Sequence, residues 1–133
     1  MSVRSLLQQA LVTALSGDPA VGGAVTAVFD APPPRVAMPY ALVEETVLSD
    51  WGAKDVAGRE GRVLVLIEDA GERPVRVRSL CDAAGAALAA MPRELGEGWR
   101  IVTMVPLRSR VLRAGRDRWT GSVEARVRLL RVS

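Results

Sequence analysis

Asp-Ala-Pro-Pro-Pro-Arg-Val-Ala-Met-Pro-Tyr-Ala-Leu-Val-Glu-Glu-Thr-Val-Leu, residues 30–48, is the stretch that divides this chain of 133 residues into two parts. Its three consecutive prolines fix φ at about −65° and remove three backbone donors, so neither a helix nor an inner strand passes through them. Pro39 also disfavours the helical conformation at Met38. We therefore expect a stiff, extended arm that ends at Tyr40, where apolar and polar residues begin to alternate.

The residues before the arm are predicted to be mainly helical. A helix is expected over Ser2–Leu15, with Ser2 as its N-cap, because apolar residues recur at helical spacing on one stripe. The stripe contains Val3, Leu7, Leu11 and Leu15. Val25–Phe29 is short and apolar, and we interpret it as an edge strand that leads into the arm.

The residues after the arm are predicted to form a sheet with one inserted helix. Strands are expected near 40–48, 62–69, 99–112 and 117–131, and a helix is expected over 75–91. The last strand alternates clearly, with Trp119, Gly121, Val123, Ala125, Val127 and Leu129 on its inner face. This order predicts one α+β domain, residues 1–133, in which two main helices pack on one face of a four-stranded, mostly antiparallel sheet.

Two segments of the predicted sheet stand out. Residues 49–61 contain three glycines and are read as a loop that is too long for a tight hairpin, and loops of this length are often functional or mobile. Residues 63–67 are apolar without interruption, which indicates a central strand covered on both faces. In a domain of this size we expect the second cover to come from another subunit.

Composition excludes several classes of chemistry. The chain contains no histidine, which removes Ser-His-Asp and Cys-His catalysis and every histidine metal motif. Cys81 is the single cysteine and is interpreted as a small buried apolar residue rather than a nucleophile. The acidic group Glu68, Asp69 and Glu72 has oxygen ligands that suit a hard cation, but such groups are more often solvated turns. We therefore predict no enzyme, no metal and no cofactor.

The basic residues allow more than one interpretation. Net charge is +3, and 17 of the 18 basic residues are arginine, which fits a bias in the genome better than a phosphate site. Arginines crowd one predicted hairpin tip (Arg108, Arg110, Arg113, Arg116 and Arg118). A nucleic-acid patch is one interpretation, although aromatic residues that would stack on bases are few. A solvated or inter-subunit face is favoured.

The N-terminus has no signal-peptide core, and no apolar run approaches the roughly 20 residues of a membrane span. We accordingly expect a soluble protein that is made in the cytoplasm. Trp51, a large aromatic residue in the glycine-rich segment, is expected either to fold back on the core or to be exposed as a contact residue.

The order and spacing of several motifs carry a resemblance to a known family. The motifs are Phe29-Asp-Ala-Pro-Pro-Pro, Met38-Pro-Tyr-Ala-Leu-Val-Glu-Glu-Thr, Asp50-Trp, Cys81-Asp-Ala-Ala-Gly-Ala-Ala-Leu, Ser109-Arg-Val-Leu-Arg and Trp119-Thr-Gly-Ser-Val-Glu-Ala-Arg-Val-Arg. Over nearly its whole length the chain resembles short tail proteins encoded by prophages and gene transfer agents. Members of this family are similar to the tail terminator, or tail completion, proteins of long-tailed phages. The chain departs from many relatives at Ile67-Glu-Asp-Ala, so its strand-to-helix turn is expected to differ.

The resemblance implies a non-enzymatic structural subunit. It implies a hexameric ring that caps the tail tube, contacts the major tail tube protein and joins the tube to the head connector. The protein would pass from the host cytoplasm into the tail of a phage-like particle. A head-side connector (stopper or adaptor) ring and a nucleic-acid-binding module that uses the arginine hairpin stay open as alternatives. Residues expected at an interface with a neighbouring subunit or the tube are Pro32, Pro33, Pro34, Asp50, Trp51, Lys54, Arg110 and Arg113.

Overall fold

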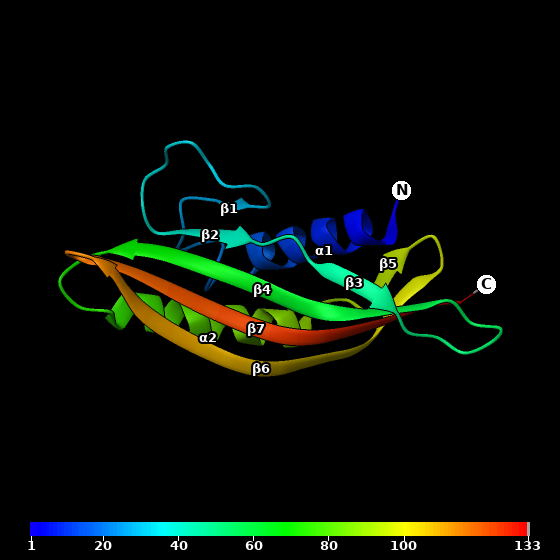
Figure 1. The fold of residues 1–133 in the computed structure, drawn as a ribbon. Coiled ribbons are helices and arrows are strands. Elements are labelled where there is room, and N and C mark those ends of the chain that lie inside the picture. The colour runs from blue at the N-terminus through cyan, green and yellow to red at the C-terminus, as the bar shows by residue number, and fades with distance from the viewer. Residues whose placement is uncertain (133) are drawn as a thin grey trace.

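In the computed structural model, which describes residues 1–132, two helices lie against one curved sheet of seven strands (Figure 1). In chain order the elements are α1 (Val3–Gly17), β1 (Val28–Phe29), β2 (Tyr40–Val43), β3 (Val47–Asp50), β4 (Gly58–Ala70), α2 (Val75–Ala90), β5 (Glu94–Gly96), β6 (Trp99–Gly115) and β7 (Arg118–Arg131). This is the α+β class that the sequence predicts.

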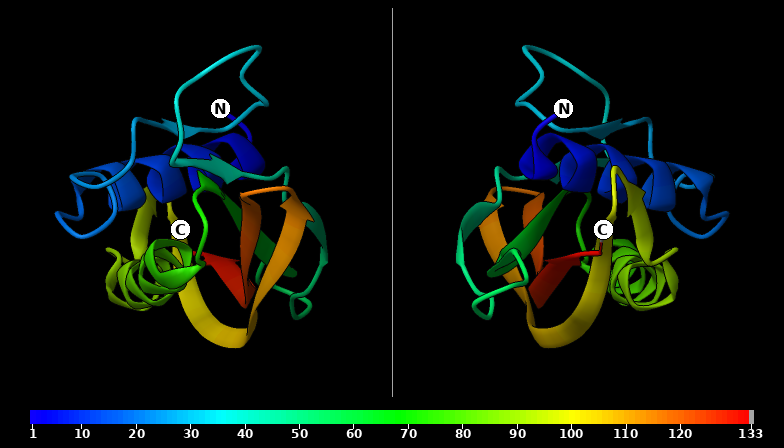
Figure 2. Two further views of the ribbon diagram at one scale, coloured as in Figure 1. Left: turned by 90° about the vertical axis from the view of Figure 1, so that its left-hand side faces the viewer. Right: turned by 90° about the vertical axis from the view of Figure 1, so that its right-hand side faces the viewer.

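The sheet is mixed and strongly curled. Its strand order is β1-β2-β4-β7-β6-β5, and β3 pairs with the part of β4 that β2 leaves free. β1 and β2 are parallel, whereas the other pairs are antiparallel. Two side views show α1 and α2 on the same side of the curved sheet (Figure 2). The long strands β4, β6 and β7 give the molecule its elongated shape (Figure 1).

Helix α1 begins as its sequence predicts. The Ser2 hydroxyl oxygen accepts a hydrogen bond of 3.1 Å from the Ser5 backbone N–H, which is the N-cap arrangement. Leu7, Leu11 and Leu15 recur every four residues and are fully buried, so one stripe of the helix faces the core.

The core lies between the two helices and the inner faces of β4, β6 and β7. On β4, Val63, Val65 and Ile67 are fully buried. The inner residues of β7 are the predicted alternate set, with Val123, Ala125, Val127 and Leu129 buried and Trp119 half-buried. The same alternation places Glu124, Arg126 and Arg128 on the outer face of the sheet, away from both helices.

The prediction of four strands was wrong in detail. Residues 40–48 form two strands, β2 and β3, and β5 is a short strand that was not predicted. The edge strand expected within residues 25–29 is present as β1. β3 continues to Asp50 and β4 begins at Gly58, so the predicted loop 49–61 shrinks to residues 51–57. Gly58 and Gly61, which the sequence analysis treats as signs of a loop, instead lie within β4, where they allow the neighbouring backbone to approach closely. A Cβ atom at Gly58 would lie 1.6 Å from the Trp51 carbonyl oxygen, and one at Gly61 would lie 2.2 Å from that of Val47.

A buried polar contact explains why β2 and β3 are separate strands. The Thr46 hydroxyl donates a hydrogen bond of 2.8 Å to the side-chain oxygen of Gln8, and the Gln8 amide nitrogen donates one of 3.3 Å to the Glu44 carbonyl. Gln8 and Thr46 are both buried, so these bonds satisfy groups that water does not reach. Helix α1 therefore supplies partners for the Glu44 carbonyl and the Thr46 hydroxyl where the strand breaks, while the Glu44 N–H still donates to the Leu64 carbonyl of β4.

The second face of β4 is covered only in part. Leu64 and Leu66 point to the outer face and are half-buried, unlike the fully buried residues that alternate with them. The two-sided apolar pattern thus corresponds, within residues 1–132, to one packed face and one face that remains partly open.

Candidate interaction surfaces

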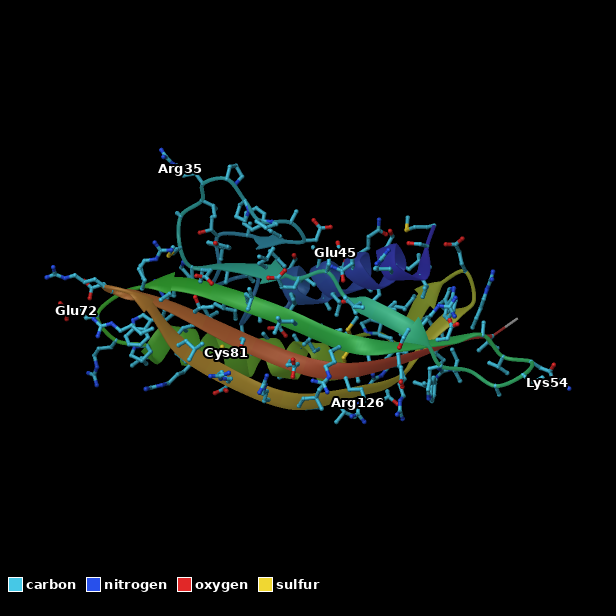
Figure 3. All side chains as sticks on the ribbon, in the orientation of Figure 1. Arg35, Glu45, Lys54, Glu72, Cys81 and Arg126 are labelled. Atoms are coloured by element: carbon cyan, nitrogen blue, oxygen red, sulfur yellow. The ribbon has the colours of Figure 1, made fainter. Side chains whose placement is uncertain are left out.

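The proline arm, residues 30–39, projects from the body beyond the edge of the sheet formed by β1 and β2 (Figures 1 and 2). Its base is closed by a hydrogen bond of 2.8 Å from the Thr26 N–H to the Pro39 carbonyl and by an edge-to-face contact between Phe29 and Tyr40, with ring centroids 5.8 Å apart. Pro32 and Pro34 are exposed and Pro33 is half-buried. Arg35 lies at the far end of the arm (Figure 3).

A second group of predicted residues lies where β3 turns into β4. The Asp50 carboxylate is 3.2 Å from an Arg59 guanidinium nitrogen, and the Arg128 guanidinium lies 5.0 Å from the centre of the Trp51 ring. Trp51 is half-buried beside Arg128 and is not among the residues that pack against the core, so the expectation that it folds back on the core was wrong. Its role as a contact residue stays a prediction. Lys54 is exposed at the tip of the 51–57 loop, at one extreme of the molecule (Figure 3).

Arg110 and Arg113 lie on β6, toward its turn into β7 at the opposite end of the ribbon (Figure 1). Arg113 donates a hydrogen bond of 3.3 Å to the Gly115 carbonyl, and its guanidinium lies 6.0 Å from the centre of the Trp119 ring. Within residues 1–132, neither Arg110 nor Arg113 forms an ion pair, and both are exposed. This end of the molecule thus presents unneutralised positive charge.

The eight residues predicted for an interface therefore do not form one site. They occupy three separate surfaces: the arm, the β3–β4 end and the β6–β7 end. Three surfaces that face different directions suit a subunit with several neighbours better than a protein with a single ligand pocket.

The outer face of the sheet carries a charge network that the sequence analysis did not identify. The Glu124 carboxylate lies between Arg62 at 3.7 Å and Arg108 at 3.5 Å, and Arg128 contacts Glu60 at 3.2 Å. An open groove of about 690 Å³ runs beside this network, lined by residues of β3, β4 and β7, such as Val47 and Arg126, and by Glu44 and Glu45 of the segment before β3. The alternation of outward-facing Glu and Arg on β7 was the sequence signal for this network. The register between β7 and β4 was needed to identify which residues pair.

The acidic group and the cysteine have structural roles. Asp69 is buried and accepts hydrogen bonds from Arg76, at 2.9 Å from its Nε, and from the Ala70 N–H at 2.8 Å. Burial alone would raise the pKa of Asp69, but these hydrogen bonds outweigh burial and hold the pKa below its ordinary value. The Thr120 hydroxyl donates to Glu68 at 2.8 Å, so Glu68 and Asp69 do not converge on one point. No group of three or more potential metal ligands gathers anywhere in residues 1–132.

Cys81 is buried between α2 and the sheet, and burial raises the pKa of its thiol. This agrees with its interpretation as an apolar core residue. Neither of the two helices in the described part of the chain is long and apolar enough to span a membrane.

A solved structure, "Virion of native gene transfer agent (GTA) particle", contains a chain that matches with a TM-score of 0.81 and 26% sequence identity over 97% of this chain and 98% of the other. The fold is thus that of a chain found in a virion. The family model "Tail completion protein gp17" matches residues 9–129. The protein belongs to this tail completion family. A search of curated proteins gave no match.

Proposed function

We propose that this chain is a non-enzymatic structural subunit of a phage-like tail. The observation that carries the proposal is the likeness, over 97% of the chain, to a chain in the virion of a gene transfer agent. Membership of the tail completion family supports it. We further propose that residues 1–133 form a single tail-terminator-like domain, which caps the tail tube and joins it to the head connector.

The proposed working form is a closed homohexameric ring. A head-to-tail interface between copies closes into a ring when its rotation permits. The partly open outer face of β4, the projecting arm and three separate surfaces support a subunit with neighbours on several sides. The major tail tube protein and the head-tail connector are the proposed partners outside the ring. The protein would enter the particle from the host cytoplasm, where assembly takes place.

We assign the arm (Pro32, Pro33, Pro34), the β3–β4 end (Asp50, Trp51, Lys54) and the β6–β7 end (Arg110, Arg113) to contacts with adjacent subunits or the tube. The arm is stiff, so ordering it against a neighbour costs less entropy than ordering a flexible tail. The Trp51 ring is held by Arg128 yet remains half-exposed, which suits an aromatic contact residue.

The test is the double variant Trp51→Ala and Asp50→Ala, scored in tail assembly. We expect tails of abnormal length or tails that fail to join heads. Trp51→Phe is the matched control, because it retains an aromatic ring beside Arg128. Normal tail length and normal joining in the double variant, with normal folding of the purified protein, would remove this loop from the interface.

One observation favours a second candidate function, nucleic-acid binding at the β6–β7 end. Arg110, Arg113, Arg116 and Arg118 are exposed and form no ion pair within residues 1–132. Binding driven by phosphate contacts weakens steeply as salt rises. Gel shifts with DNA at low and moderate salt separate the two functions, since tight, salt-sensitive binding would favour this alternative. A head-side connector ring is distinguished by labelling the protein in intact particles.

A further inference from the structure

Besides the short terminal strands β1 and β5, two strands of the sheet, β3 and β6, have an edge that other strands of residues 1–132 leave largely or wholly uncovered. β6 pairs with β7 along one side, and β5 covers its other side only near Trp99 and Arg100. β3 pairs with β4 alone, because β1 covers β2 and stops before β3 begins. Each free edge presents backbone N–H and C=O groups that can pair with a further strand.

The free edge of β6 is positive. Register shifts interrupt β6 at Pro106/Arg108 and at Arg113/Gly115, and the stretch between them is regular. Residues 107–113 contain three arginines (Arg108, Arg110, Arg113) and no acidic residue. Leu112 is 52% exposed on the same outer face as Arg108 and Arg110. Charged side chains often protect an edge strand from pairing with another chain, but an exposed leucine favours such a contact.

The free edge of β3 is negative. The segment 44–50 contains Glu44, Glu45 and Asp50 and no basic residue. Val47 is 79% exposed on its outer face. Pairing of Val47 with Arg62 and of Ser49 with Glu60 places both on the outer side of the sheet, and Glu45, which precedes β3, lines the same outer groove as these two residues.

We propose that these two edges pair with each other between neighbouring copies of this chain, so that the β6 edge of one subunit receives the β3 edge of the next. The inference rests on the ring in the proposed function and names the surfaces that build it. Opposite charge selects this partner: two β6 edges would set arginine against arginine, and two β3 edges would set acid against acid. Since one chain supplies both edges, the contact is head-to-tail and repeats around a ring.

The fold also sets the direction of the pairing. Within one subunit β3 runs antiparallel to β6, because each step from β3 through β4 and β7 to β6 reverses direction. A turn of about 60° between neighbours in a six-membered ring does not reverse a strand, so the pairing between subunits is antiparallel. This direction brings Glu44 and Glu45 toward Arg110 and Arg113, and Asp50 toward the Arg108 end. Exposed Val47 then lies between the two charged ends.

The experiment exchanges charge at Glu45 and Arg110, which are exposed and form no ion pair within residues 1–132. The variants Glu45→Arg and Arg110→Glu are produced singly, as a double variant, and as an equal mixture of the two single variants in cells that make the particle. The measurement is the yield of tails joined to heads, relative to the wild type. Arg4→Glu on the exposed side of α1 controls for a general effect of charge reversal.

We expect each single variant to lower this yield at least about tenfold, because every interface in the ring then sets like charges together. The double variant restores opposite charges, and the mixture restores them in an alternating ring of six. Single variants that assemble like the wild type would overturn the proposal. So would single variants that fail without rescue by either combination, provided that the purified proteins fold.

The proposed function is judged separately, by an antibody label on the wild-type protein in intact particles. A label at the head-proximal end of the tail together with unaffected single variants would leave the function standing and reject only the edge pairing. A label elsewhere would reject the function itself.

Discussion

Gly121 of β7 lies so close to Cys81 of α2 that a Cβ atom added to the glycine would be 2.4 Å from the Cys81 Sγ. The same Cβ atom would be 2.9 Å from a methyl group of Val77. Both neighbours are buried in the core, so neither side chain has free space into which it can move. The missing side chain at Gly121 therefore sets how closely α2 approaches the sheet.

Gly121→Ala is expected to lower the free energy of unfolding by about 1–3 kcal/mol, the usual cost of overpacking a core. Adding Cys81→Ala should recover part of this loss, because it removes the nearer of the two clashing atoms. Gly85→Ala is a control of opposite sign: its Cβ would meet only a Val123 methyl at 3.9 Å, and alanine favours a helix over glycine by about 0.5–1 kcal/mol. Urea denaturation measures all three, and equal effects at Gly121 and Gly85 would contradict the packing argument.

Asp69→Asn is expected to lower the free energy of unfolding by about 1–2 kcal/mol at pH 7, through loss of charged hydrogen bonds. The loss is moderated because Arg76 is 56% exposed and remains hydrated without its partner. The pKa of Asp69 is lower in the folded state than its ordinary 3.8, so its contribution is present above that pH and disappears as the pH falls below it. Wild type and variant should thus converge in acid. Asp30→Asn in the exposed arm should show no such difference at any pH.

Gln8→Ala is expected to cost about 1–3 kcal/mol of folding stability, because it leaves the buried Thr46 hydroxyl without its acceptor and the Glu44 carbonyl without a donor. Gln9→Ala, one residue along on the exposed side of α1, should change stability by no more than about 0.5 kcal/mol. Thermal unfolding of the Gln8→Ala and Gln9→Ala variants measures the two effects. Similar losses at both positions would contradict the explanation by the buried contact, because helix propensity favours alanine over glutamine at either position.

Replacing Pro32, Pro33 and Pro34 together with alanine is expected to change the free energy of unfolding by less than about 1 kcal/mol, because the arm projects from the sheet. Tail assembly should fall, because a flexible arm loses more entropy when it is ordered against a neighbour. Calorimetry on the purified protein and counts of joined particles provide the two readings. Full assembly with a flexible arm would show that its stiffness is irrelevant to the interface.

Local patterns in the sequence predict much of this fold. The N-cap at Ser2, the stripe on α1 and the inner face of β7 follow from spacing alone, and the structure confirms each. The break between β2 and β3 is not local, because it depends on Gln8, which lies 36 residues before Glu44. Gly58 and Gly61 could not be interpreted from the sequence alone, because glycine is used both in flexible loops and where two backbones approach closely.

The candidate surfaces show the same limit. Trp51 stood out in the sequence as an isolated aromatic residue, but its partner Arg128 lies on a strand far along the chain. The outer ion pairs became apparent only once the register of β4 against β7 was known. The assignment of the eight residues to an interface stays a prediction.

The register between β4 and β7 also limits insertions and deletions in this chain. The two strands pair residue by residue, without a shift, from Gly58 opposite Leu130 to Ala70 opposite Arg118. One residue gained or lost inside either strand would exchange its core-facing and solvent-facing side chains from that point onward. Differences in length among relatives are therefore expected in the segments 30–39 and 51–57, and at the bulges of β6. Relatives are thus expected to differ in the size of the projecting arm and of the 51–57 loop while the paired core strands keep a constant length.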